Sequence, residues 1–128
     1  MDVTPLIPAG RQIIQSYGAT GFKISGIRYE DAVMVTPEKT WVWTGKPSVQ
    51  DLSAADFTDY LPPGNAYDVY LLGTGKTSTF LPAPLLRDLK SRQIHPDVME
   101  SGAACRTYNV LMAEGRRVVA FLLRPLAS

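Results

Sequence analysis

The sequence predicts a single α/β domain that spans all 128 residues. Two unbroken apolar runs, Val69–Leu72 and Val118–Leu123, are typical of strands that are covered on both faces. Two helical patterns and an extended stretch lie between these runs, so the C-terminal half predicts a βαβαβ unit with helices on the faces of a sheet. Short alternating segments in the first 45 residues predict an added antiparallel β meander.

The N-terminal meander is predicted from alternation and turn residues. Phe22–Ser25 and Ile27–Glu30 alternate around a Ser-Gly pair, which is the signature of a tight hairpin. Two further short strands, Ala32–Thr36 and Thr40–Thr44, are separated at Pro37. We therefore expect the first 45 residues to form an antiparallel meander.

Other features of the first 65 residues fix turns and a short helix. Tyr17–Gly21 has the composition of a turn, and Trp41 and Trp43 share one face of a strand, where large aromatic rings usually cover a core. Ser53–Asp56 resembles a capping box with Asp in place of Glu. It predicts a short helix that Pro62–Gly64 stops.

The C-terminal half predicts two amphipathic helices. The first follows a nine-residue loop, Gly73–Leu81, and covers about Pro84–Gln93. After the extended stretch Ile94–Met99, the second covers about Gly102–Glu114, with Gly115 placed as its C-terminal cap. A βα loop of that length is unusual and leaves the carboxyl end of a strand, where open α/β sheets place ligands.

The composition excludes several classes of function. Thirteen basic and twelve acidic side chains nearly cancel, so nothing favours a nucleic acid or an anionic membrane as partner. No apolar run approaches the ~20 residues of a membrane helix, and the N-terminus lacks the pattern of a secretory signal. A single Cys105 and a single His95 predict neither a metal site nor a disulfide. We expect a cytoplasmic protein without a cofactor.

The segment Gly73–Ser78 resembles the end of a P-loop but fails its spacing. The first glycine of that motif would have to stand at Tyr70, inside the strand, and Pro82 and Pro84 postpone the helix whose N-terminus would face the phosphates. A dinucleotide-binding motif fails as well, because Ser78 occupies its third glycine position. We therefore expect no nucleotide hydrolysis.

The candidate site lies where two strands end and two helices follow. Right-handed crossovers would bring the loop after the first apolar run and the start of the second helix to the same edge of the sheet. Free N–H groups at that helix start, with the lysine and arginine nearby, would attract a small anion or a partner's carboxylate. The candidate ligand- or partner-binding residues are Gly73, Thr74, Gly75, Lys76, Gly102, Ala103, Cys105, Arg106 and Asn109.

Two interpretations remain open for residues on the second helix. Cys105 in its first turn could have a lowered pKa, helped by Arg106, and act as a nucleophile; alternatively, it is a small buried core residue. Nothing in the sequence places His95 beside it. Arg106 and Asn109 lie opposite the apolar arc of the helix, where they could bind a ligand or simply be solvated. No catalytic residue is therefore assigned.

Three blocks of sequence resemble one family. They are Ser16–Gly26, Leu72–Gly75, and Ala104–Asn109 followed by Glu114–Arg116, and they come in the order seen in the small Mth-type domain proteins of bacteria and archaea. Eukaryotic relatives of that family include the third mitochondrial respiratory complex I assembly factor and an adipogenesis-associated protein. The resemblance covers about Ile7 to Pro125 and matches the bacterial branch, since Ser101-Gly102 stands where the mitochondrial proteins tend to carry a Thr-Pro-Asn type start.

The resemblance implies both a fold and a role. The fold would have three layers: a mixed central sheet, helices, and an extra layer of antiparallel strands. The role would be that of a non-enzymatic interaction or assembly module with a protein partner, and the family offers no catalytic residues to carry over. The alternative is a small-molecule binding protein or an enzyme whose site lies between Gly73–Lys76 and Gly102–Asn109.

Overall fold

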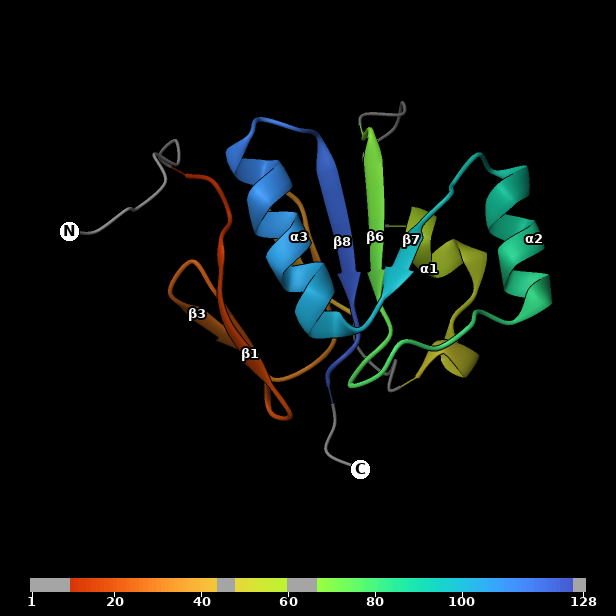
Figure 1. Ribbon diagram of the computed structural model, residues 1–128, viewed down its shortest axis with the longest axis horizontal. Coiled ribbons are helices and arrows are strands. Elements are labelled where there is room, and N and C mark those ends of the chain that lie inside the picture. Colours follow the sequence, from red (N-terminus) through yellow and green to blue (C-terminus); the bar gives the residue numbers. More distant parts are fainter. Residues whose placement is uncertain (1–9, 44–47, 60–66, 126–128) are drawn as a thin grey trace.

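The computed structural model describes residues 10–43, 48–59 and 67–125 and contains two β-sheets. A three-stranded antiparallel sheet has the order β1-β2-β3, and a five-stranded mixed sheet has the order β5-β4-β8-β6-β7 (Figure 1). The strands are β1 (Ile14–Gly18), β2 (Gly21–Ile24), β3 (Ile27–Tyr29), β4 (Val33–Val35), β5 (Thr40–Val42), β6 (Val69–Gly73), β7 (Asp97–Met99) and β8 (Val118–Leu122). The helices are the 3₁₀ helix η1 (Val49–Asp51), α1 (Ala54–Thr58), α2 (Ala83–Ser91) and α3 (Ser101–Ala113).

The two apolar runs form interior strands, as the sequence predicts. β6 pairs in parallel with both β8 and β7, and β8 also pairs antiparallel with β4. Phe121 of β8 contributes to a buried cluster on one face of the sheet, and Leu71 of β6 contributes to a second cluster on the other face. Both residues are almost completely excluded from solvent. The sheet therefore has a core on each side.

The predicted N-terminal strands are present and pair antiparallel, but they divide between two sheets. The hairpin around Ser25 and Gly26 is confirmed, with φ angles of 46° and 85° at these residues. β4, however, leaves that sheet and pairs with β8. Its three residues are all buried and apolar, so it is stable only inside the larger sheet. Part of the predicted turn at Tyr17–Gly21 belongs to β1 and β2.

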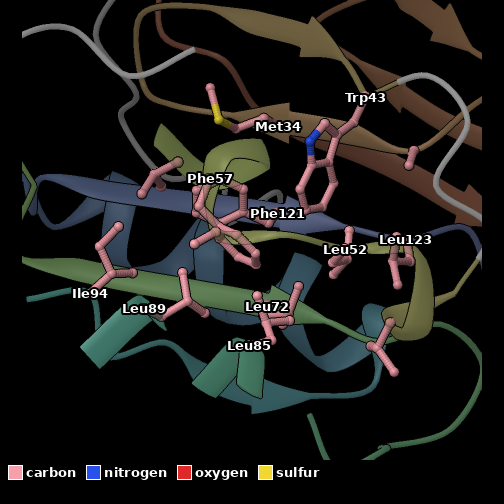
Figure 2. Close-up of a cluster of buried hydrophobic side chains, with 14 residues drawn as sticks. Met34, Trp43, Leu52, Phe57, Leu72, Leu85, Leu89, Ile94, Phe121 and Leu123 are labelled. Carbon is pink, nitrogen blue, oxygen red and sulfur yellow. The ribbon is translucent and has the colours of Figure 1, made fainter. Parts of the chain in front are cut away.

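The first core cluster lies under α1 and α2. Trp43, Phe57 and Phe121 meet there, with ring centroids 5.4 Å apart for Trp43 and each phenylalanine and 4.6 Å apart for the two phenylalanines (Figure 2). Trp43 is buried and Trp41 packs against the same cluster, which confirms that both rings cover a core. Leu89 adds a buried contact from α2.

The second core cluster lies under α3 and the three-stranded sheet. Tyr108 and Met112 of α3 pack together with Phe22 and Ile24 of β2 against the five-stranded sheet. α3 and the small sheet stand beside each other in Figure 1 and cover the same face. Helices α1 and α2 cover the opposite face, so the predicted three-layer arrangement is confirmed, with the extra antiparallel strands in the layer of α3.

The helix boundaries follow from their capping residues. The Asp56 carboxylate accepts the Ser53 N–H at 2.7 Å, which confirms the predicted capping box of α1. The stop predicted at Pro62–Gly64 lies outside the described residues. α2 begins and ends slightly earlier than predicted, and only the last three residues of the extended stretch before α3 form β7. Gly115 has a φ of 80° just after α3, as expected of a C-terminal cap.

Candidate functional site

The two candidate segments meet at one edge of the five-stranded sheet. β6 and β7 run in parallel, so their carboxyl ends lie together. The Thr74 N–H donates to the Met99 carbonyl at 2.9 Å, and the Ser101 N–H donates to the Gly75 carbonyl at 2.8 Å. The predicted convergence of the loop and the helix start is therefore confirmed. The segments, however, are joined directly by hydrogen bonds.

Ser101 is the centre of this contact, although sequence reasoning did not single it out. Its buried hydroxyl accepts the Gly75 N–H at 2.8 Å and donates to the Leu123 carbonyl at 2.5 Å. One side chain thereby links the segments that follow β6, β7 and β8. We call Gly73–Gly75, Ser101 and Leu123 the strand-end junction. The sequence signal for it was a small hydroxyl residue at a helix start after a strand, which by itself is common.

The structure explains why glycine occupies positions 73 and 75 of the junction. A Cβ atom at Gly73 would lie 2.8 Å from both Cα and Oγ of Ser101, which is closer than real Cβ contacts. Gly75 has a φ of 110°, where a side chain would strain the backbone. Close approach between β6 and α3 therefore requires glycine at the first position, and the turn requires it at the second.

Thr74 organises the loop that leaves the junction. Its hydroxyl donates to the Thr77 carbonyl at 2.7 Å and accepts the Thr79 N–H at 3.1 Å. These bonds fold the chain around the threonine side chain, which is itself buried. Lys76 is exposed within the turn, so its charge faces solvent.

The prediction of free N–H groups at the start of α3 is wrong, because Glu100 caps the helix. Its carboxylate accepts the Gly102 N–H at 2.9 Å and the Ala103 N–H at 2.5 Å. A carboxylate at a helix N-terminus satisfies these donors and also interacts favourably with the helix dipole. A small anion would have to displace Glu100 from this position.

Gly102 lies directly beneath an aromatic side chain from the other sheet. A Cβ atom at Gly102 would lie 2.8 Å from Cε2 of Tyr17, so the tyrosine ring rests directly on the helix backbone. The Tyr17 hydroxyl accepts a hydrogen bond from Arg106, which also forms an ion pair with Glu100 at 3.3 Å. Arg106 is exposed, and such surface pairs contribute little to stability. This corner holds β1 against α3.

Asn109 is partly buried and binds the backbone of β1. Its Oδ1 accepts the Ile14 N–H at 3.0 Å, and its Nδ2 donates to the Ile14 carbonyl at 2.8 Å. The side chain thereby pairs with β1 much as a neighbouring strand would. Neither interpretation from the sequence included this contact, because the helical pattern of α3 could not show that β1 lies against this side.

The nucleophile hypothesis for Cys105 is also wrong. The thiol is buried in the second core cluster. Burial raises its pKa to about 12, and the Glu100 carboxylate adds to this, while Arg106 opposes it without prevailing. A thiol with so high a pKa carries almost no thiolate near neutral pH. His95 is exposed before β7, so the two side chains share no buried site. The core interpretation of Cys105 is the correct one.

Residues 10–43, 48–59 and 67–125 contain no group of histidine, cysteine or acidic side chains that could hold a metal ion. Within the same ranges, no helix is both long and apolar enough to cross a bilayer.

A hollow in the surface lies beside the junction, between α2 and β7. Its volume is about 480 Å³, and we call it the α2–β7 groove. It is lined by Ser78, Thr79, Phe80, Leu81, Leu86 and Val98. Phe80 is 97% exposed and Leu86 is 50% exposed. Sequence reasoning noted the length of the loop but did not predict the groove, since an apolar residue in a loop does not reveal whether it is covered.

Comparison with known proteins places these features in a family. Residues 14–123 match the family described as DUF498, protein of unknown function (DUF498/DUF598). An uncharacterised protein of Rhodobacter capsulatus is 32% identical over 115 residues, which cover 90% of this chain and 86% of that protein. The solution structure of a Mth938-like domain protein from Bordetella pertussis is 26% identical, with a TM-score of 0.76 and coverage of 100% of this chain and 95% of that one.

The similarity extends to eukaryotes. NADH dehydrogenase (ubiquinone) 1 alpha subcomplex assembly factor 3 of Danio rerio is 32% identical over 116 residues. The match covers 91% of this chain and 66% of the zebrafish protein, so the chain spans slightly less than two thirds of that relative. Because the family match includes every strand from β1 to β8, this chain belongs to the DUF498 family, and its fold is that of a Mth938-like domain.

Proposed function

We propose that this protein is a non-enzymatic interaction module of the assembly-factor type, which acts by binding another protein. The observation that carries the proposal is the similarity to assembly factor 3, which covers 91% of this chain. The match covers 116 residues of this chain and 66% of the zebrafish protein, so the identity of that protein's partner does not transfer.

The chemistry of the strand-end junction supports this proposal. Ser101, Thr74 and Glu100 use their polar groups for bonds within the domain. Cys105 is buried with a raised pKa. Polar groups that catalyse or bind a small molecule have to face the ligand, whereas these four side chains face their own chain.

Two of the candidate residues retain charged groups at the surface, and we extend the proposal to them. Lys76 is exposed on the loop after β6, and the Arg106 side chain is 63% exposed on α3. Both lie at the edge where β6 and β7 end. We propose them as contacts for the partner, while the glycines and Asn109 support the fold beneath them.

Affinity purification with chemical crosslinking, from cells that naturally contain the protein, tests the function. We expect one or a few proteins to be recovered with the wild-type bait and to be lost in competition with excess untagged protein. Lys76→Ala and Arg106→Ala should reduce recovery, whereas Arg116→Ala, an exposed cation beyond the opposite end of α3, should not. Recovery of no protein above background, together with a co-purified metabolite, would favour the small-molecule alternative.

We also propose a cytoplasmic location. The single thiol, Cys105, is free and buried, which is compatible with a reducing compartment. Cell fractionation with the native protein tests this, and recovery in the membrane or periplasmic fraction would contradict it.

A further inference from the structure

The α2–β7 groove is lined by exposed apolar side chains and lies between a helix and a strand. Phe80 and Leu86 are both large and substantially exposed. Val98 of β7 lies on the opposite wall, and residues 78–81 connect the two walls. In Figure 1, α2 stands beyond β7 at the end of the sheet. An apolar, concave surface of this kind is typical of a place where a ligand or a partner segment packs.

β7 offers backbone hydrogen-bonding groups beside this groove. It is the last strand of the five-stranded sheet, and within the described part of the chain it pairs with β6 alone. The Met99 carbonyl accepts the Thr74 N–H, so the backbone groups of Met99 face β6. Backbone groups of neighbouring strand residues point in opposite directions, so the N–H and carbonyl of Val98 face away from the sheet. An extended segment could pair with them as an added strand.

The charged side chain that shares the groove face of α2 is basic. Lys90 follows Leu86 by one helical turn and therefore shares its face of α2, and Arg87 lies about 100° around the helix. Asp88 lies about 200° from Leu86, away from the groove. The acidic residue of β7, Asp97, precedes Val98 and points to the opposite face of the sheet. The groove side is thus complementary to an acidic partner.

From these three observations we infer that the α2–β7 groove binds an extended segment of a partner protein with apolar side chains between acidic residues. The segment pairs with Val98 along the edge of β7 that has no partner strand within the described part of the chain. Its apolar side chains pack against Phe80 and Leu86, and its acidic side chains lie near Lys90. This inference rests on the proposed protein-binding function and specifies the partner's chemistry and its place on the domain.

A displayed library of random ten-residue peptides tests the chemistry before the partner itself is identified. Peptides are selected on the wild-type protein and counter-selected on Phe80→Ser, which retains the fold because this side chain is 97% exposed. We expect enriched peptides to combine acidic residues with β-branched or aromatic residues and to lack proline in the middle. Enrichment of basic peptides, or no difference from the counter-selection, would overturn the inference.

An enriched peptide, made synthetically, then tests the geometry by NMR titration and binding measurements. The Val98 amide should shift saturably and gain protection from hydrogen exchange. Phe80→Ser should weaken binding by about tenfold or more, as for an aromatic residue central to an interface. Lys90→Glu should also weaken binding of this peptide. The Lys90→Glu protein should instead prefer a version of the peptide in which lysine replaces the acidic residues. Ile27→Ser, a change of an exposed apolar residue on β3, is the matched control and should have no effect.

Two outcomes separate this inference from the proposed function. If the wild-type bait recovers a protein partner and the Phe80→Ser and Lys90→Glu baits recover it equally, the groove inference fails and the protein-binding function stands. If no bait recovers a protein, the function itself fails. A wild-type dimer in solution that Phe80→Ser converts to a monomer would show that a second copy occupies the groove, and it would overturn the acidic-segment inference.

Discussion

The strand-end junction and the α2–β7 groove are neighbours, but they differ in how their groups are used. At the junction, the Ser101 hydroxyl and the glycine backbone are buried and bonded to one another. In the groove, Phe80 and Leu86 face solvent. The glycine-rich segment that resembles a P-loop in the sequence thus has a structural role, because it connects the ends of the strands. The exposed apolar residues that follow it form the surface that we propose for an extended segment of the partner.

The largest expected effect concerns the two-sided core that supports both regions. Phe121→Ala should lower the free energy of unfolding by about 3–5 kcal/mol, and Leu71→Ala by about 2–5 kcal/mol, because each leaves a cavity in a different core cluster. Denaturant unfolding measures both. Val110→Ala on the exposed side of α3 is the control and should change stability by less than about 0.5 kcal/mol. A similarly small loss for either core variant would show that its strand is not covered.

The next effect tests the junction itself. Ser101→Ala should cost about 2–3 kcal/mol, because the Gly75 N–H and the Leu123 carbonyl then stay buried without the hydroxyl. Denaturant unfolding again provides the measurement. Ser91→Ala, which removes an exposed hydroxyl on α2, is the matched control. Equal stability of the two variants would mean that water replaces the Ser101 hydroxyl and that the junction is open.

A further effect on stability comes from pH, because two buried side chains of α3, Cys105 and Tyr108, can lose a proton. Burial raises the pKa of Cys105 to about 12 and also raises the pKa of Tyr108. In the unfolded chain these groups lose their protons at lower pH, so the stability that they contribute is full below about pH 9 and is lost as the pH rises toward 12. Each group can contribute a slope of up to about 1.4 kcal/mol per pH unit.

Unfolding free energies measured between pH 8 and pH 11 test this, and Cys105→Ala should give a shallower decline above pH 9 than the wild type. An unchanged slope in Cys105→Ala would mean that the thiol titrates normally, which would reopen the hypothesis of a reactive cysteine.

The smallest expected effect on stability belongs to the groove. Phe80→Ser should change the free energy of unfolding by less than about 0.5 kcal/mol, since an exposed side chain has little contact to lose. The same variant should weaken partner binding, and this separation of stability from binding sharpens the contrast with Ser101→Ala. A loss of stability comparable to that of Ser101→Ala would show that Phe80 packs on its own domain.

Much of this architecture could be predicted from local patterns. The interior strands were recognisable because a run without polar residues cannot face water on either side, and the hairpin at Ser25-Gly26 was recognisable from its turn residues. The convergence of the loop after β6 with the start of α3 followed from the handedness of βαβ connections. The family resemblance extended this to the three layers.

Other features depended on partners that are distant in the sequence. Asn109 is polar on a helix and would be solvated if β1 did not lie against it, 95 residues earlier in the chain. In the sequence, β4 resembles one more strand of a meander. In the structure it pairs with β8, where its three residues are all buried. The pKa of Cys105 depends on how deeply the thiol is buried. Helical periodicity shows which side of the helix carries the thiol, but not how completely that side is covered.

By itself, the sequence determined the α/β class, the identity of the buried strands and the edge at which they end, because these follow from the polarity and spacing of nearby residues. The tertiary structure alone decided which polar groups at that edge remain available. Ser101 and Glu100 satisfy the donors that the sequence left open, while Phe80 and Leu86 stay exposed beside β7, the last strand of the five-stranded sheet in the described part of the chain. The physical reason is that a hydrogen bond or a buried contact requires both partners in position, and only the folded chain brings them together.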